Sequence, residues 1–272
     1  MIALSEYSIS NRGSVNRSIE IAKNAGFDGI QLALRENGGF SYESSDSEFL
    51  AVKQFLNGSG MFISDLSVGG CPISSSDLSQ REKAKAKLKR AIEAAALLGT
   101  DAVLLIPGAV TNESAYNDVY KSCVTALKEF APVAEKNRVN LCVENVWNGF
   151  LLSPFDFRNL IDDVNSPFVN AYFDVGNVVF SSLPEQWIEI LGNRICRVHF
   201  KDFRKSAAGA AGFVMIGEGD VNYCDVMNAL KKIGYNSFYT SEADPPKPGI
   251  KGFEELFYKF TADTMRNIIN EE

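Results

Sequence analysis

Short apolar runs alternate with longer stretches of helical period along the whole chain. Nearly every position within a run is apolar, whereas a strand with one solvent-exposed face would alternate strictly between apolar and polar residues. Continuous apolar runs are typical of parallel strands covered on both sides. The runs are Ile2–Ser5, Gly29–Ala33, Phe62–Leu66, Ala102–Pro107, Asn140–Glu144, Asn170–Asp174, Ile195–Phe200 and Ser237–Glu242. The pattern therefore predicts eight parallel strands.

The segments between the runs combine apolar residues at helical spacing with helix start and stop signals. Val15 and Ile19 fall on one face of a predicted helix that Gly26 ends. Asp77 is expected to cap a longer helix that ends at Gly99. These segments are predicted to be the crossover helices that parallel strands require.

Two prolines mark later helices in different ways. Pro132 falls inside a predicted helix and is expected to kink it, because its ring blocks the hydrogen bond to the carbonyl of Lys128. Pro154 follows Ser153 and is expected in the first turn of the next helix, where a proline is well tolerated.

Repeated strand–helix units with no linker between them favour an α/β fold, a single (β/α)8 TIM barrel formed by residues 1–272. The alternative is an open, doubly wound sheet. Such a sheet usually carries a glycine-rich phosphate loop after its first strand, and here that place holds Ser5-Glu6-Tyr7-Ser8. The closed barrel is therefore the preferred interpretation.

Composition narrows the class of protein. The 272 residues are 46% hydrophobic and 22% charged, which is ordinary for a globular protein with a large core. The formal net charge of −7 argues against nucleic acid as a partner. The five cysteines form no C-x-x-C pair, and no secretory signal or long apolar segment is evident. We expect a cytoplasmic protein without a membrane partner.

Ionisable residues close four successive late runs. Glu144 and Asp174 end the fifth and sixth runs, His199 lies near the end of the seventh, and Glu242 ends the eighth. In a barrel the carboxyl ends of the strands meet at the active-site mouth. Three converging carboxylates would repel one another unless a cation bound them. With an imidazole they suit one divalent ion, Mn²⁺, Mg²⁺, Co²⁺ or Zn²⁺.

Each of these residues also has a structural interpretation. A carboxylate at a strand end often caps the next helix or pairs with a lysine. His199 is the single histidine in the chain, and a lone histidine is often a buried or surface group without a ligand. The metal-site interpretation depends on all four residues falling in matching places on successive strands.

Five sequence blocks, in this order, resemble the xylose isomerase-like barrel superfamily of sugar and sugar-phosphate isomerases and epimerases. The resemblance implies that Glu144, Asp174, His199 and Glu242 bind the metal and that Glu144 and Glu242 also transfer protons. The blocks are Cys142-Val143-Glu144-Asn145, Phe173-Asp174-Val175-Gly176-Asn177, Arg197-Val198-His199-Phe200-Lys201-Asp202, Gly217-Glu218-Gly219-Asp220-Val221 and Ser241-Glu242.

The implied reaction is proton transfer through a metal-stabilised enediolate of a sugar, sugar phosphate or cyclitol, with the ketose 3-epimerase type favoured. Two alternatives stay open: an inosose or dehydroshikimate dehydratase, and a non-catalytic sugar-binding barrel. The superfamily also contains trinuclear zinc endonucleases, which a net charge of −7 and one histidine exclude. Relatives are often dimers or tetramers, so a homo-oligomer is an open expectation.

Four further residues are candidates for substrate binding. Asn177 lies three positions past Asp174, and Lys201 should point the same way as His199. Glu218, in a glycine-flanked loop, is a candidate to orient His199 or the substrate, and Arg35 is a candidate phosphate anchor.

The chain departs from the free-ketose 3-epimerases at one place. In those relatives an Asn-Arg pair and another Glu follow the first metal glutamate, whereas this chain reads Glu144-Asn145-Val146-Trp147-Asn148-Gly149-Phe150. Trp147 and Phe150 are candidates to wall the substrate pocket. The subfamily is therefore not fixed by the motif.

Overall fold

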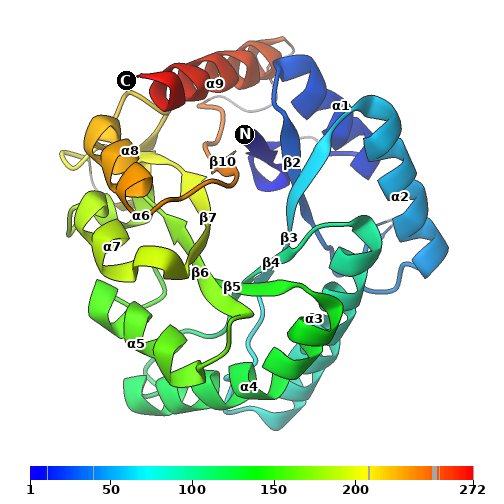
Figure 1. Ribbon diagram of the computed structural model, residues 1–272, viewed down its shortest axis with the longest axis vertical. Helices are drawn as coiled ribbons and strands as arrows, with labels where there is room; N and C mark the ends of the chain where they lie inside the picture. Colours follow the sequence, from blue (N-terminus) through cyan, green and yellow to red (C-terminus); the bar gives the residue numbers. More distant parts are fainter. Residues whose placement is uncertain (11, 39, 208, 247–249, 251, 272) are drawn as a thin grey trace.

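The chain folds into a closed barrel of parallel strands surrounded by helices (Figure 1). The computed structural model describes residues 1–10, 12–38, 40–207, 209–246, 250 and 252–271. Around the barrel the strands follow the order β1-β10-β7-β6-β5-β4-β3-β2. Their bounds are β1 Ile2–Ser5, β2 Gly29–Ala33, β3 Phe62–Gly70, β4 Ala102–Ile106, β5 Asn140–Glu144, β6 Val169–Asp174, β7 Ile195–Phe200 and β10 Tyr239–Ser241. The predicted (β/α)8 barrel is confirmed.

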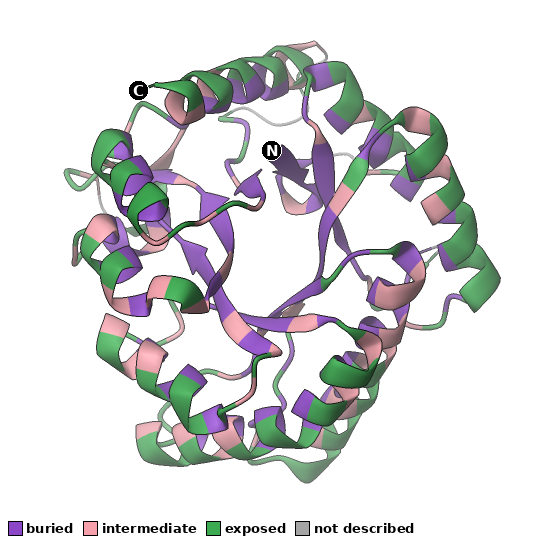
Figure 2. Ribbon diagram, in the orientation of Figure 1, coloured by how far each residue is buried: buried purple, intermediate pink, exposed green. Residues whose placement is uncertain are grey.

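Barrel closure joins the two ends of the sheet. Ile2 of β1 lies opposite Tyr239 of β10 and Ala3 opposite Gly29 of β2, all in parallel register. The enclosing helices are α1 Val15–Ala25, α2 Asp46–Ser59, α3 Leu78–Leu98, α4 Tyr116–Asn137, α5 Pro154–Val164, α7 Pro184–Leu191, α8 Tyr223–Lys232 and α9 Phe253–Asn270. Figure 2 shows buried residues on the strands and on the inner faces of these helices.

Several short elements lie between β6 and α8. They are the four-residue helix α6 (Gly176–Val179), the two-stranded antiparallel pair β8 (Asp202–Phe203) and β9 (Phe213–Val214), and the 3-10 turns Gly192–Arg194 and Gly209–Gly212; a further 3-10 turn, Glu6–Ser8, follows β1. Within the described residues, no helix has both the length and the apolarity needed to cross a bilayer.

The predicted helix signals are confirmed at several positions. Gly26 and Gly99 both adopt the left-handed conformation that ends a helix, at the C-caps of α1 and α3. The side chain of Asp77 caps the amino end of α3, and Ser153 caps α5 with Pro154 in its first turn.

The strand and helix bounds differ from the prediction in a few places. Strand β3 continues to Gly70, and β10 ends at Ser241, so that Glu242 lies one residue beyond its strand. Helix α4 is assigned as one helix through Pro132 to Asn137, so the proline does not interrupt it. Pro132 lies on the exposed side of α4, where water can bind the carbonyl that has lost its helical partner.

Candidate metal centre and active site

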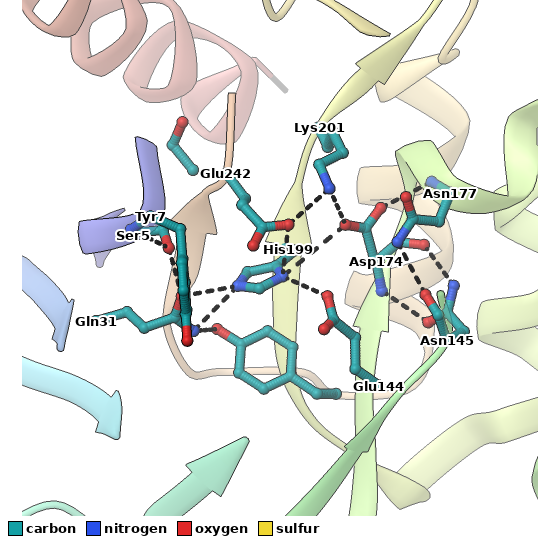
Figure 3. A network of polar contacts seen from close by, with 12 residues as sticks. Ser5, Tyr7, Gln31, Glu144, Asn145, Asp174, Asn177, His199, Lys201 and Glu242 are labelled. Atoms are coloured by element: carbon teal, nitrogen blue, oxygen red, sulfur yellow. Dashed lines mark hydrogen bonds and ion pairs between the residues drawn. The ribbon is translucent and has the colours of Figure 1, made fainter. Parts of the chain in front are cut away.

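The carboxyl ends of four adjacent strands bring Glu144, Asp174, His199 and Glu242 together (Figure 3). Glu144 and Asp174 are the last residues of β5 and β6, and His199 is the penultimate residue of β7. Asp174 is the direct register partner of His199 across β6 and β7. Because side chains alternate along a strand, these residues point into the barrel together with their neighbours two positions earlier.

The four side chains form a compact and largely buried cluster. One oxygen or nitrogen from each of the four lies within 4.8 Å of the others. Nδ1 of His199 lies 2.8 Å from Oε1 of Glu144, 3.6 Å from Oε2 of Glu242 and 3.8 Å from Oδ2 of Asp174. Glu144, Asp174 and His199 are buried, and Glu242 is partly buried. The imidazole therefore presents one ring nitrogen to all three carboxylates.

The two oxygens of Asp174 have different surroundings. Oδ1 accepts a hydrogen bond of 2.8 Å from the backbone N–H of Asn177. Oδ2 is buried and accepts no hydrogen bond from the described residues, and Nζ of Lys201 lies 3.4 Å away. A buried carboxylate oxygen without a hydrogen-bond donor is costly unless a cation binds it. Together with the oxygen and imidazole donors around it, this oxygen fits a divalent metal ion.

Burial and mutual charge shift the pKa values within the cluster. Burial raises the pKa of Glu144 to about 7, although the charge of His199 opposes the shift. Burial also raises the pKa of Asp174. Burial would lower the pKa of His199, but the carboxylates of Glu242 and Glu144 outweigh it and raise the value to about 9. These groups therefore titrate as one coupled set.

Lys201 contributes a positive charge to the cluster. Its ammonium donates a hydrogen bond of 2.6 Å to Oε2 of Glu242 and lies 3.4 Å from Oδ2 of Asp174. Burial acts to raise the pKa of Glu242, but the charges of Lys201 and His199 outweigh it and lower the pKa. The structure thus places Lys201 beside the candidate ligands, as its two-residue spacing from His199 predicts.

Asn177 lies at the cluster but uses its side chain within the protein. Its Nδ2 donates to the backbone carbonyl of Asn145 at 2.9 Å. Asn145 in turn exchanges two hydrogen bonds of 2.9 Å with the backbone of Asp174. These amides fix the end of β6 and leave Oδ2 of Asp174 directed at the cluster. Substrate contact by Asn177 stays a prediction.

Two candidate residues lie away from the cluster. Arg35 follows β2 and forms an ion pair of 2.6 Å with Glu6 and a hydrogen bond to the carbonyl of Gly13, so much of its guanidinium is already engaged within the protein. Glu218 is exposed, and its backbone carbonyl, rather than its carboxylate, accepts from Arg204. The two ring nitrogens of His199 face Glu144 and Gln31, so Glu218 does not orient the imidazole, and its contact with substrate stays a prediction.

Comparison with protein families matches residues 19–258 to the family described as xylose isomerase-like TIM barrel. The chain belongs to this family. The match covers most of the chain, including the strand ends that carry all four members of the cluster. The resemblance seen in the sequence blocks is thereby confirmed.

Curated proteins similar to this xylose isomerase-like barrel include several named as L-ribulose-5-phosphate 3-epimerases. It is 24% identical over 233 residues to the putative L-ribulose-5-phosphate 3-epimerase SgbU of Haemophilus influenzae, covering 82% of each chain. It is 24% identical to the L-ribulose-5-phosphate 3-epimerase UlaE of Escherichia coli O157:H7, covering 82% of this chain and 80% of that protein. Similarity to the uncharacterized protein MJ1311 of Methanocaldococcus jannaschii, at 26% identity, spans 62% of this chain and 59% of that protein.

Solved structures share the fold of this xylose isomerase-like barrel. A D-psicose 3-epimerase crystallised in the presence of D-fructose superposes with a TM-score of 0.82 at 18% identity, covering 99% of both chains. The IolI protein with a bound zinc atom superposes with a TM-score of 0.80 at 17% identity, covering 98% of this chain and 97% of that one. At these identities the likeness shows a common fold.

Sequence reasoning missed the polar residues inside the barrel beneath the cluster. Gln31 lies in the middle of β2, and its amide approaches Nε2 of His199 (Figure 3). Asp65 of β3 and Tyr172 of β6 contact the same amide. A signal for them was present, because Gln31 and Asp65 interrupt apolar runs predicted to be buried.

An apolar groove of about 400 Å³ lies beside the cluster in this xylose isomerase-like barrel. Asn145 and Asn177 line it on the side of the cluster, and Trp147 and Phe180 line its outer part. Trp147 is half exposed and donates its indole N–H to the carbonyl of Asn177 at 2.7 Å. Phe150, the other predicted wall residue, is buried in the core, so it does not line the groove.

Proposed function

We propose that this protein is a divalent-metal-dependent isomerase of the sugar 3-epimerase type, acting on a free or phosphorylated ketose. The observation that carries the proposal is the convergence of Glu144, Asp174, His199 and Glu242 within 4.8 Å at the mouth of the barrel. The relatives SgbU, named as a putative L-ribulose-5-phosphate 3-epimerase, and UlaE, named as an L-ribulose-5-phosphate 3-epimerase, support the reaction class. A metal ion and two proton carriers together can catalyse a carbonyl-stabilised proton transfer, and this cluster contains candidates for both.

Four side chains would hold the ion. Nδ1 of His199 and one oxygen each of Glu144, Asp174 and Glu242 are the available ligands. A divalent ion bound there would withdraw electron density from the carbonyl oxygen and the neighbouring hydroxyl of a ketose, and so acidify the C–H bond at C3. The oxygen-rich ligand set suits Mn²⁺, Mg²⁺, Co²⁺ or Zn²⁺.

Glu144 and Glu242 are the two proton carriers that inversion at one carbon requires in this proposal. Glu144 ends β5 and Glu242 follows β10, and β6 and β7 lie between these two strands in the barrel. The two carboxylates therefore reach the cluster from opposite ends of a row of four strands. One carboxylate removes the proton from its own face of the sugar, and the bonding electron pair passes into the enediolate. The other glutamate, as the carboxylic acid, delivers a proton to the opposite face of the same carbon. No atom is gained or lost overall.

Lys201 is proposed to bind a substrate hydroxyl or phosphate. Its ammonium lies at the cluster and is only partly exposed, with Phe213 beneath it at 5.0 Å from Nζ to the ring centroid. The aromatic ring and the two carboxylates fix the direction of the ammonium. A substrate bound at the ion would therefore meet a positioned cationic donor.

The test is incubation of ketoses, ketose phosphates and inososes with the protein and Mn²⁺ in D₂O, with and without EDTA. Epimerisation is expected to place deuterium at C3 of at least one substrate, and EDTA is expected to stop the exchange. The exposed Glu189→Gln variant is the matched control and should exchange at the normal rate, since Glu189 pairs with Lys232 on the outer surface.

The other outcomes each contradict the proposal in a different way. Deuterium at C1 or C2 would identify an aldose–ketose isomerase, and loss of water with an ultraviolet-absorbing product would identify a dehydratase. Absence of exchange with every substrate would favour a sugar-binding barrel without catalytic activity. Exchange that persists unchanged in EDTA would remove the metal from the reaction.

A further inference from the structure

The two ring nitrogens of His199 have opposite surroundings. Nδ1 faces the three carboxylates of the cluster, whereas Nε2 faces the side-chain amide of Gln31. Figure 3 shows the imidazole between these two groups, with Glu144 on one side and Gln31 on the other. His199 is fully buried, so water does not replace either partner.

Metal binding at Nδ1 determines the protonation of Nε2. A neutral imidazole that binds a metal through one nitrogen carries its proton on the other. That Nε2–H is then a buried donor and needs an acceptor. Oε1 of Gln31 lies 3.3 Å from Nε2 and is placed to accept it. The amide nitrogen of Gln31 lies 3.0 Å from the same ring nitrogen, but it can donate there only when Nε2 carries no proton.

The amide of Gln31 is held in one orientation by its neighbours. Its Nε2 donates to Oδ1 of Asp65 at 2.7 Å, and its Oε1 accepts from the hydroxyl of Ser5 at 2.5 Å. Oδ1 of Asp65 accepts this hydrogen bond, so Asp65 determines which end of the amide is nitrogen. With the nitrogen bound to Asp65, the oxygen is left for Ser5 and His199.

The three residues form a row across adjacent strands. Ser5 of β1 lies opposite Gln31 of β2, and Gln31 lies opposite Asp65 of β3. The pairing of β2 with β3 shifts by one residue just before Gln31, and this shift brings Asp65 rather than Ser64 opposite the amide. All three side chains are buried in the barrel, where apolar residues are the usual filling.

Burial of a carboxylate and an amide at this place is unfavourable for folding alone. Asp65 is fully buried and accepts hydrogen bonds from Gln31, Tyr172 and Ser64. Among these partners, Gln31 is the one whose amide also reaches Nε2 of His199. The row therefore acts on the cluster through Gln31 and its contact with His199.

We propose that Gln31, oriented by Asp65, is the positioning residue that holds His199 with Nδ1 directed at the metal. The inference rests on the proposed function, since it requires that the cluster bind a divalent ion. Gln31 contacts the imidazole at Nε2, whereas the carboxylates face Nδ1, so it acts on the cluster through the imidazole. It also fixes which ring nitrogen carries the proton when the ion is bound.

The test is Mn²⁺ binding, measured as loss of the electron paramagnetic resonance signal of free Mn²⁺ during titration of the apoprotein. The variant Gln31→Met is similar in size and has no acceptor for Nε2–H, so its Mn²⁺ affinity is expected to fall about 10–100-fold. If Gln31→Met does not fold, Gln31→Asn withdraws the amide by one methylene and should show a loss in the same direction.

The double variant Gln31→Glu with Asp65→Asn tests whether Gln31 positions His199 through its hydrogen bond or only fills space in the barrel. It exchanges the amide and the carboxylate between β2 and β3. The amide now on β3 would donate to the carboxylate now on β2, and that carboxylate would still accept from Nε2–H of His199. Mn²⁺ affinity is expected to return close to the wild-type value. The control variant Asn170→Met removes a strand amide at the far end of the barrel, where Asn170 bonds Asn140, and should leave Mn²⁺ affinity unchanged.

Three results would overturn the inference. Wild-type affinity in Gln31→Met would show that His199 needs no acceptor at this position. Equal weakening in Gln31→Met and in the double variant would reduce Gln31 to a packing residue. Failure of the wild-type protein itself to bind Mn²⁺ would overturn the proposed function along with it, and this result is recognised before any variant is compared.

Discussion

The ammonium of Lys201 lies 2.6 Å from Oε2 of Glu242, so a side-chain cation and a candidate metal ligand are in direct contact. The same ammonium lies 3.4 Å from Oδ2 of Asp174. Two carboxylates of the cluster therefore share the positive charge of one lysine. A divalent ion at the cluster competes with this lysine for the same oxygens, while a substrate would find the lysine next to the ion.

Replacement of Lys201 by Met is expected to have opposite effects on metal binding and on turnover. Two unit charges about 4 Å apart near a protein surface interact by about 4 kcal/mol, so removal of the ammonium should tighten Mn²⁺ binding by at least about tenfold. Turnover should fall because a substrate oxygen loses its cationic donor. Mn²⁺ titration and kcat/KM for the best substrate of the panel measure the two effects. Weaker Mn²⁺ binding in Lys201→Met would contradict the competition between lysine and ion.

Replacement of Glu242 by Gln is expected to separate catalysis from metal binding. The amide keeps one oxygen for the ion but cannot carry the proton, so the rate of epimerisation at C3 should fall by about 10²–10⁴-fold. Mn²⁺ affinity should fall less than in His199→Ala, which removes a ligand altogether. Equal epimerisation rates in Glu242→Gln and the wild-type protein would remove Glu242 from proton transfer.

The stability of the protein in EDTA is expected to decrease as the pH rises from about 5 to 9. In the folded protein the pKa of Glu144 is raised from 4.5 to about 7 and that of His199 from 6.5 to about 9, so the folded state binds more protons than the unfolded state across this range. Each contribution is fully present below the unfolded pKa and is lost as the pH passes the folded pKa. The lowered pKa of Glu242 acts in the opposite direction, but only below its unfolded value of 4.5.

Thermal unfolding in EDTA at a series of pH values measures this dependence. Addition of Mn²⁺ should reverse the trend, because the ion requires deprotonated ligands and its stabilising effect grows with pH. A midpoint in EDTA that rises between pH 6 and pH 9 would contradict the pKa shifts of the cluster.

Replacement of Asp202 by Ala is expected to destabilise the loop that follows β9. The buried carboxylate accepts four backbone hydrogen bonds of 2.9–3.1 Å, from Phe203, Gly217, Gly219 and Val221. Its loss leaves several donors without a partner, and we expect the free energy of unfolding to fall by about 3 kcal/mol.

Chemical denaturation measures this loss, and Asp220→Ala serves as the control in the same loop. Asp220 is exposed and accepts one backbone hydrogen bond, from Lys205, so its replacement should cost less than about 1 kcal/mol. Similar losses in the two variants would show that the buried carboxylate does not organise the loop.

The sequence predicted the candidate ligands because position along a parallel strand has a fixed meaning. Glu144 and Asp174 each end an apolar run, and the carboxyl ends of the strands of a closed barrel meet at one mouth. The direction of the Lys201 side chain could be predicted in the same way, because side chains alternate along a strand and Lys201 lies two positions after His199. The contacts of loop residues follow no such rule, so the sequence could not predict them. In the structure Arg35 forms an ion pair with Glu6, and Glu218 is exposed to solvent.

The sequence by itself determined the eight strands, the barrel and the four residues at its mouth, because burial pattern and helix signals are local properties of the chain. Only the tertiary structure decided which of these residues touch. The register of β6 against β7 shifts by one residue, and this shift places Asp174 opposite His199 instead of Val198. A similar shift places Asp65 opposite Gln31. Register depends on how whole strands pack around a closed barrel, and no segment of sequence contains that information alone.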